Sequence, residues 1–132
     1  CTSLIKVTLP SSLESINKSF FNNCKSLKQI EIPSSVEELK EKSFEGCVSL
    51  EKVTLPSSIT IIFGYAFGNC SSLKEIIIPS SVKRIIWGAF DNCKSLQNVS
   101  FELPSSLIDI DNCIFSNCIS LESVSIPSSV KL

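Results

Sequence analysis

The sequence predicts a solenoid, mainly β, in which short coils stack along one axis. The first observation is a tandem repeat of 23 residues, clearest in residues 24–46, which read CKSLKQIEIPSSVEELKEKSFEG before Cys47 starts the pattern again. The second is that several kinds of residue stay in step from copy to copy, as a true repeat requires. The third is that each copy holds an alternating apolar segment that ends at a proline, which is typical of a short strand. Because one coil cannot bury its apolar face alone, the copies are expected to stack.

Three columns of residues define the register of the repeat. They are Cys1, Cys24, Cys47, Cys70, Cys93 and Cys118; Pro10, Pro33, Pro56, Pro79, Pro104 and Pro127; and Phe21, Phe44, Phe67, Phe90 and Phe115. The spacing is even except where residues 100–103 carry two extra residues. We therefore expect residues 1–132 to form a single repeat array of about five and a half repeats. Neither end resembles the polar cap that a solenoid needs, so we expect the array to be a fragment of a longer one.

The composition excludes several classes of protein. With 43% hydrophobic and 19% charged residues, the chain is apolar enough to fold. It has 12 Lys and Arg against 13 Asp and Glu, mixed along its length, which argues against nucleic acid as a partner. The longest weakly polar run, residues 59–68, is about half of what a membrane span requires, so we expect no direct membrane insertion.

The first element of each coil is a short strand. In residues 27–32 the apolar positions alternate with polar ones toward the end and are rich in β-branched side chains, and the other copies share this pattern. Such alternation predicts a strand with one buried face. Pro33 ends the strand because proline has no N–H to donate to a sheet, and the two serines after it favour a turn.

The second half of each coil is expected to hold another short extended segment and a closing turn. Val36 and Leu39 form a second apolar pair after the turn and indicate this segment on the opposite flank. Residues 42–47 then close the coil. Phe44 and Cys47 are three apart, so both are expected to point inward from one helical or 3-10 turn.

Stacking in register places equivalent residues about 4.8 Å apart, as in neighbouring strands. The columns are then continuous internal ladders, and the predicted ladder residues are Cys24, Cys47, Cys70, Cys93, Phe21, Phe44, Phe67 and Phe90.

The seven cysteines allow three interpretations. A disulfide framework meets the distance requirement between neighbouring coils, but side chains in register run parallel instead of toward each other. A zinc site needs closely spaced pairs, and the only close pair is Cys113 and Cys118, in a chain without histidine. We interpret the column cysteines as buried reduced thiols and expect no metal. Cys113 stands in a different column, with Tyr65 and Gly88, and is expected to be exposed and reactive.

The pattern C-x-S-L-x-x-[IV]-x-[IL]-P-S-S-[VLI]-x-x-[IL]-x-x-x-x-F-x-x-C resembles the leucine-rich repeats of the BspA-like type, also called the Treponema pallidum type, over essentially the whole chain. The resemblance implies a leucine-rich-repeat solenoid whose strands line one face. It also implies a protein that is at the cell surface or secreted and takes part in adhesion or protein binding. The chain departs from the pattern at the insertion near Phe101, in its lack of caps, and at Phe20, Ser43 and Ile114, where many members carry alanine.

Catalysis is hard to place in this sequence. It has no histidine for general base chemistry and no Gly-rich phosphate loop, and no serine or column cysteine stands out from its copies. A catalytic residue is a singular feature, whereas repeats reproduce each position. We expect no enzyme activity and no cofactor.

What varies between copies is the outward side of the first strand, the usual binding surface of repeat proteins. The candidate binding residues are Lys6, Thr8, Lys28, Glu31, Lys52, Thr54, Lys74, Ile77 and Asn98. Ile77 is the strongest candidate because it is apolar where most others are polar. Trp87 and Tyr65 belong to the closing-turn side, and two interpretations stay open for them: a second contact patch or lateral packing.

Two functions from different classes follow. The first is a protein-interaction module that resembles surface adhesins and binds a protein or glycoprotein. The second is a cytoplasmic structural scaffold within a larger assembly, where reduced cysteines are natural and where the array packs with further repeats or subunits.

Overall fold

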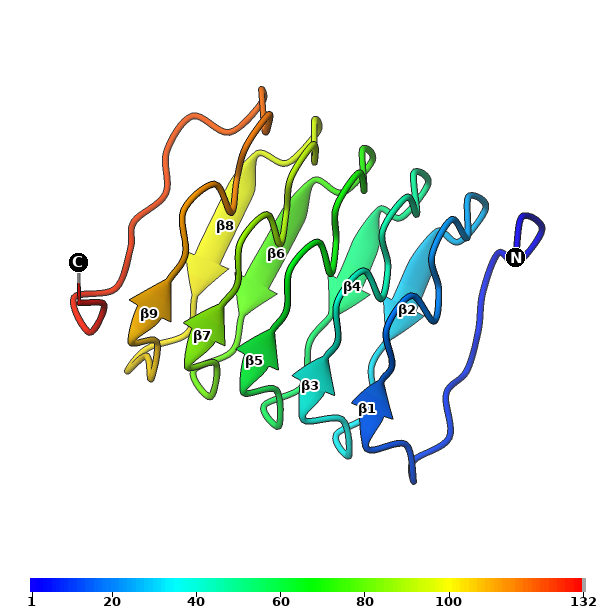
Figure 1. The fold of residues 1–132 in the computed structure, drawn as a ribbon, viewed down its shortest axis with the longest axis horizontal. Coiled ribbons are helices and arrows are strands. Elements are labelled where there is room, and N and C mark those ends of the chain that lie inside the picture. The colour runs from blue at the N-terminus through cyan, green and yellow to red at the C-terminus, as the bar shows by residue number, and fades with distance from the viewer. Residues whose placement is uncertain (132) are drawn as a thin grey trace.

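The computed structural model describes residues 1–131, which form a parallel β-solenoid without a helix (Figure 1). Each coil contributes strands to two rows. The main row holds β2 (Gln29–Glu31), β4 (Lys52–Thr54), β6 (Glu75–Ile78) and β8 (Asn98–Phe101). The second row holds β1 (Ser15–Ile16), β3 (Glu38–Leu39), β5 (Ile61–Ile62), β7 (Arg84–Ile85) and β9 (Asp109–Ile110).

The two rows differ in how completely their strands pair. In the second row all five strands form one parallel sheet in the order β1-β3-β5-β7-β9. In the main row the pairing is interrupted: β2 pairs with β4 and β6 pairs with β8, as two separate sheets. The two extra residues lie before β9 and do not shift the register of that strand. Ile110 pairs with Ile85, as equivalent residues of neighbouring coils do elsewhere in the row.

The core is a set of in-register columns enclosed between the rows. The rings of Phe21, Phe44, Phe67, Phe90 and Phe115 form a continuous stack with successive centroids 5.2, 5.3, 5.4 and 5.6 Å apart. The inner strand positions, such as Ile30, Val53 and Ile76, are buried between exposed neighbours, as the alternating pattern predicts. Each coil therefore completes its core only against the coils beside it.

Serines that follow the prolines connect neighbouring coils in the middle of the array. In three central coils the second serine of the pair donates its hydroxyl to a carbonyl of the preceding coil: Ser35 to Leu13, Ser58 to Val36 and Ser81 to Ile59, at 2.6, 2.6 and 2.7 Å. These bonds satisfy backbone acceptors where the strands have ended.

The prediction of a helical or 3-10 closing turn is wrong. Residues 41–46 form a series of turns instead. Lys42 and Gly46 both have a positive φ, of 59° and 75°, which interrupts any helix. The amides also alternate between partners: Ser43 N–H bonds to Lys40 within the coil, whereas Phe44 N–H bonds to Ala66 of the next coil at 2.8 Å. In a helix all of these amides would bond within the same segment, whereas here every second amide bonds to the next coil. Phe44 and Cys47 still point into the core.

The expectation that all column cysteines are reduced is also corrected. Cys1 and Cys24 form a disulfide, with Cα atoms 4.7 Å apart, within the range that a disulfide spans. The other column cysteines are free thiols, and each donates to a phenylalanine carbonyl of the preceding coil, 26 residues earlier for Cys47, Cys70 and Cys93 and 28 residues earlier for Cys118.

Candidate binding face

The outward side of β2, β4, β6 and β8, with the residues that flank these strands, forms what we call the main strand face. Pairing in register places Gln29 beside Lys52 and Glu31 beside Thr54. Further along, Ile77 lies beside Ser100. Because strands lie about 4.8 Å apart and outward residues recur about every 7 Å, this face is a regular grid of mostly polar side chains.

The structure exposes all nine residues that the sequence singled out, namely Lys6, Thr8, Lys28, Glu31, Lys52, Thr54, Lys74, Ile77 and Asn98. Ile77 is 57% exposed and lies in the middle of the main row, beside the interruption between β4 and β6. The nine residues are thus exposed on the outward side of the main row, as the sequence predicts. Their role in binding stays a prediction.

Shallow depressions bring some of these residues together. One of about 670 Å³ is lined by Lys6, Thr8, Glu31, Lys52 and Thr54, together with the prolines and serines at the strand ends. A smaller one of about 170 Å³ lies over the interruption between β4 and β6. Ile77 lines it beside Lys52 and Thr54, so these three candidates share one site.

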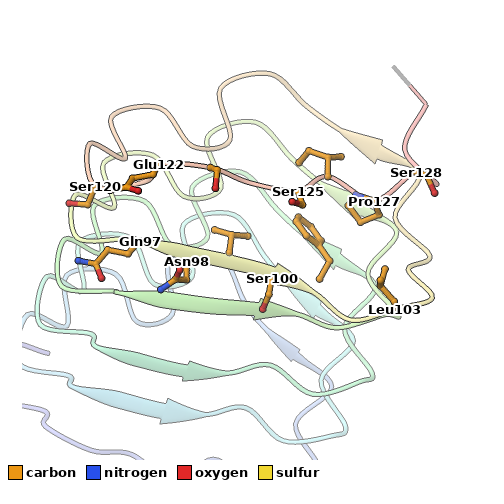
Figure 2. Close-up of a pocket in the computed structure, with 13 residues that line it drawn as sticks. Gln97, Asn98, Ser100, Leu103, Ser120, Glu122, Ser125, Pro127 and Ser128 are labelled. Atoms are coloured by element: carbon orange, nitrogen blue, oxygen red, sulfur yellow. The ribbon is translucent and has the colours of Figure 1, made fainter.

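A third depression, of about 960 Å³, lies between β8 and the extended segment of the last coil (Figure 2). Asn98 is the only one of the nine candidates in it. Sequence reasoning missed Leu103, which lines this depression and is 77% exposed. The two-residue insertion could have indicated that Leu103 is exposed, because inserted residues are out of register with the repeat and do not belong to an inward column.

Charged groups on the main strand face have no ion-pair partners within residues 1–131. The four ion pairs of the described residues are Lys18 with Glu41, Lys40 with Glu38, Lys42 with Glu45 and Arg84 with Asp109, all on the closing turns or the second row. The lysines of the main strand face thus keep their ammonium groups available to a ligand. By contrast, the Lys18 ammonium bonds to the Glu41 carboxylate and lowers the pKa of that carboxyl.

The described part of the chain holds no group of three or more Cys, Asp or Glu side chains placed to bind a metal ion. It also contains no helix with the length and apolar character needed to cross a membrane.

Comparison with known proteins adds a family. A family model described as BspA type Leucine rich repeat region matches residues 1–102 and 99–132, in six copies. No curated protein matches the chain.

Among solved structures, a leucine-rich repeat protein of T. pallidum is 35% identical, with a TM-score of 0.79 over 83% of this chain and 50% of that chain. One from Bacteroides ovatus is 33% identical, with a TM-score of 0.74 over 92% of this chain and 37% of that chain. A leucine rich cell surface protein from Faecalibacterium prausnitzii is 43% identical, with a TM-score of 0.68 over 70% of this chain and 24% of that chain. The chain thus spans half or less of the length of these proteins.

Proposed function

Because this chain belongs to the BspA-type leucine-rich repeat family, we propose that it is a non-catalytic interaction module whose main strand face binds a protein or glycoprotein. The observation that carries the proposal is the contrast between the two sides of the coil. All four ion pairs of the described residues lie outside this face, whereas Lys6, Lys28, Lys52 and Lys74 of this face are exposed and unpaired among the described residues. Unpaired charges around an exposed apolar side chain are typical of a surface kept for a partner.

We place the centre of the interaction at Ile77. Its side chain is exposed on β6 beside the smaller depression, and Lys52 lies across the interruption between β4 and β6. An apolar contact surrounded by charged groups supplies affinity at the centre and orientation at the rim.

Residues 52, 74 and 77 provide the direct test. The triple variant Lys52→Ala, Lys74→Ala, Ile77→Ala is expected to keep the fold and to lose affinity for the partner by at least about tenfold, because it removes the centre and two exposed lysines of the same face. The partner is first captured on the wild-type chain from a surface-protein extract and then measured in purified form by biolayer interferometry.

A matched control uses the same residue types outside the face. Lys25, Lys94 and Ile119 are all exposed and lie in one column beside the closing turns. Changing these three to alanine removes the same charges and apolar surface, and the variant is expected to bind as the wild type does. Equal losses in both triple variants, or in neither, would move the site away from the main strand face.

For the location we propose the cell surface, in an adhesive role. A 43% identical structure is named as a leucine rich cell surface protein, which supports this placement. The alternative is a cytoplasmic scaffold, and the five free cysteines favour it because reducing compartments keep thiols in that state. An antibody to this chain that labels intact cells would support the surface role. Labelling only after permeabilisation would favour the scaffold.

A further inference from the structure

The outer side of β1, β3, β5, β7 and β9, with the residues that flank these strands, departs from the repeat at its centre. We call it the five-stranded face. Ile61 of β5 pairs with Glu38 on one side and Arg84 on the other, so an apolar residue stands between two charged ones. Phe63 occupies the repeat position that Lys40 holds in the preceding coil, and Tyr65 occupies the position that Lys42 holds there. Since a repeat reproduces each column, an apolar departure in one central coil indicates a local role.

Phe63, Tyr65 and Trp87 form the aromatic cluster of this face, and two of their rings are in contact. The rings of Tyr65 and Trp87 meet edge to face, with centroids 5.1 Å apart at 83°. Tyr65 lies against Gly88, where an added Cβ would come within 3.1 Å of its ring. Trp87 remains 48% exposed, so the two residues are both laterally packed and open to contact. Exposed Trp and Tyr held rigidly by neighbours are typical of the centre of an interface.

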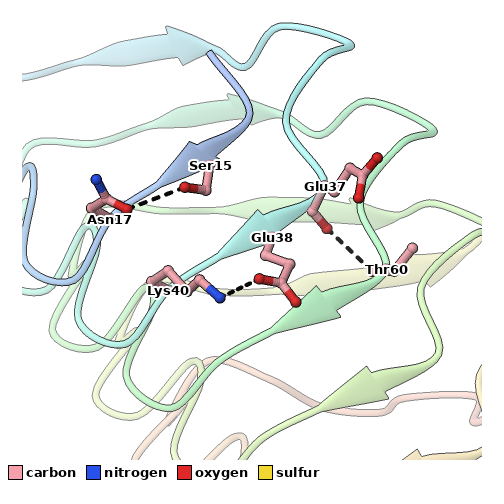
Figure 3. A network of polar contacts seen from close by, with 6 residues as sticks. All are labelled: Ser15, Asn17, Glu37, Glu38, Lys40 and Thr60. Carbon is pink, nitrogen blue, oxygen red and sulfur yellow. Dashed lines mark hydrogen bonds and ion pairs between the residues drawn. The ribbon is translucent and has the colours of Figure 1, made fainter.

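Lysines border this cluster on its N-terminal side. The Lys40 ammonium lies 4.9 Å from the centre of the Phe63 ring, and that of Lys42 lies 5.6 Å from the centre of the Tyr65 ring. Both lysines also pair with glutamates of their own coil (Figure 3 shows Lys40 with Glu38). They are thus satisfied within the chain and help to hold the aromatic rings.

Charges of opposite sign flank the central coil at equal distances. Glu37 lies one coil before Thr60, and Lys83 lies one coil after it. The backbone connects the three residues: the Thr60 amide donates to the Glu37 carbonyl, and the Lys83 amide donates to the Thr60 carbonyl, both at 2.8 Å. Figure 3 shows Glu37 beside Thr60. Glu37 and Lys83 are exposed, and within residues 1–131 neither forms an ion pair.

We propose that the five-stranded face binds a second copy of the chain, related to the first by a two-fold axis that runs along β5. Such an axis sets the coil of β3 in one copy against the coil of β7 in the other. It brings each Glu37 opposite Lys83 of the second copy. Ile61, Phe63 and Tyr65 lie along the axis and meet their own equivalents. A two-fold interface requires self-complementarity of this kind.

The size of the face determines the strength of the dimer. Five coils at about 4.8 Å and six residues at about 3.3 Å give a patch of roughly 24 by 20 Å, or about 480 Å² per copy. This is below the roughly 800 Å² per partner of a standard stable interface. The association is therefore weak, rises with protein concentration and weakens as salt screens the exposed charges. The main strand face lies in the other row (Figure 1) and stays free in this dimer.

Charge exchange between Glu37 and Lys83 tests the proposal by sedimentation velocity over a range of protein concentrations. The wild type is expected to dimerise reversibly. Glu37→Lys places lysine against lysine in the dimer, and Lys83→Glu places glutamate against glutamate, so each is expected to weaken association by at least about tenfold at low salt. An equimolar mixture of the two variants is expected to regain dimers, because every cross-copy contact is then attractive. The double variant E37K/K83E is expected to regain them alone.

Matched reversals on the main strand face serve as controls. Glu51 and Lys74 are exposed there, and Glu51→Lys and Lys74→Glu are expected to associate as the wild type does. Far-UV circular dichroism of every variant checks that it is folded. A wild type that stays monomeric at all concentrations overturns the proposal. So does a mixture or double variant that fails to regain dimers when the single variants have lost them. No ligand takes part, so this result is independent of the proposed ligand-binding function.

Discussion

The thiol of Cys70 donates a hydrogen bond to the carbonyl oxygen of Phe44, which lies 3.3 Å away and 26 residues earlier. Cys93 and Cys118 bond in the same way to Phe67 and Phe90, at 3.1 Å each. The cysteine column therefore does more than fill space, because each thiol ties the closing turn of one coil to that of the coil before it. Burial raises the pKa of the Cys70 thiol well above its usual value, which keeps it protonated as a donor.

We expect one fast thiol in the native protein. Cys113 is exposed, whereas Cys47, Cys70, Cys93 and Cys118 are buried. Without reductant, a thiol reagent such as DTNB should label one cysteine rapidly and five after denaturation, because Cys1 and Cys24 are joined. Cys113→Ser should remove the fast phase alone. Seven thiols in the denatured, unreduced protein would show that the disulfide is absent.

The buried thiols also predict alkaline sensitivity. Burial raises the pKa of Cys47 and Cys118 to about 11, while an unfolded thiol titrates near 8.5. Between these values the unfolded chain has lost protons that the folded chain keeps. The free energy of unfolding should therefore be unaffected by these groups below about pH 8.5 and should fall as the pH rises toward 11.

Urea denaturation at pH 7, 9 and 10.5 measures this dependence. The variant Cys47→Ala, Cys118→Ala is less stable at pH 7 but should show a shallower decline, since two of the titrating groups are gone. An equal decline in both proteins would assign the alkaline effect to other residues.

The phenylalanine stack predicts a large core effect at Phe67. This ring is fully buried and stacks on Phe44 and Phe90. Phe67→Ala removes contacts on both sides in the middle of the array and should cost about 3–5 kcal/mol of unfolding free energy. Phe20→Ala is the matched control, because Phe20 is 55% exposed, and it should cost far less. The opposite ranking in urea denaturation would contradict the assignment of the inward column.

A buried hydroxyl without a partner predicts a stabilising substitution. Ser43 is fully buried, and its Oγ has no hydrogen-bond partner in the described chain. The equivalent residues of the next two coils are Ala66 and Ala89, also fully buried. Ser43→Ala should raise the unfolding free energy by about 1 kcal/mol, since it removes an unsatisfied polar group at little change in volume.

The control for this prediction is Ser58→Ala. The Ser58 hydroxyl donates to the Val36 carbonyl at 2.6 Å, so its removal should lower stability by about 1 kcal/mol. Thermal unfolding of both variants measures whether each substitution raises or lowers the stability. A Ser43→Ala variant that loses stability would show that the hydroxyl has a partner in solution.

The regular parts of the fold were predictable because their signals are local. The alternation around Ile30 identifies a strand and its buried side, and the repeat spacing sets the register in which Ile16, Leu39, Ile62 and Ile85 pair. In a solenoid each coil contacts its neighbours through the same columns, so one period describes nearly every contact. The exposed grid of the main strand face follows from the same two signals.

The irregular parts depended on contacts between coils that the pattern does not contain. Nothing in the residue types of Lys42 or Tyr65 indicates a positive φ; the amide of Phe44, bonded to the next coil, holds that backbone in place of a helical turn. The repeat pattern likewise does not distinguish Cys1 and Cys24, which form a disulfide, from the column cysteines that are free thiols.

By itself, the sequence determined the coil, its register, the inward columns and the family. Only the tertiary structure decided the course of the closing turns, the interruption between β4 and β6, and the placement of Glu37 and Lys83 around an aromatic centre. The physical reason is that periodicity specifies which residues face inward, whereas hydrogen bonds and charges between coils depend on which different side chains the stacking brings together.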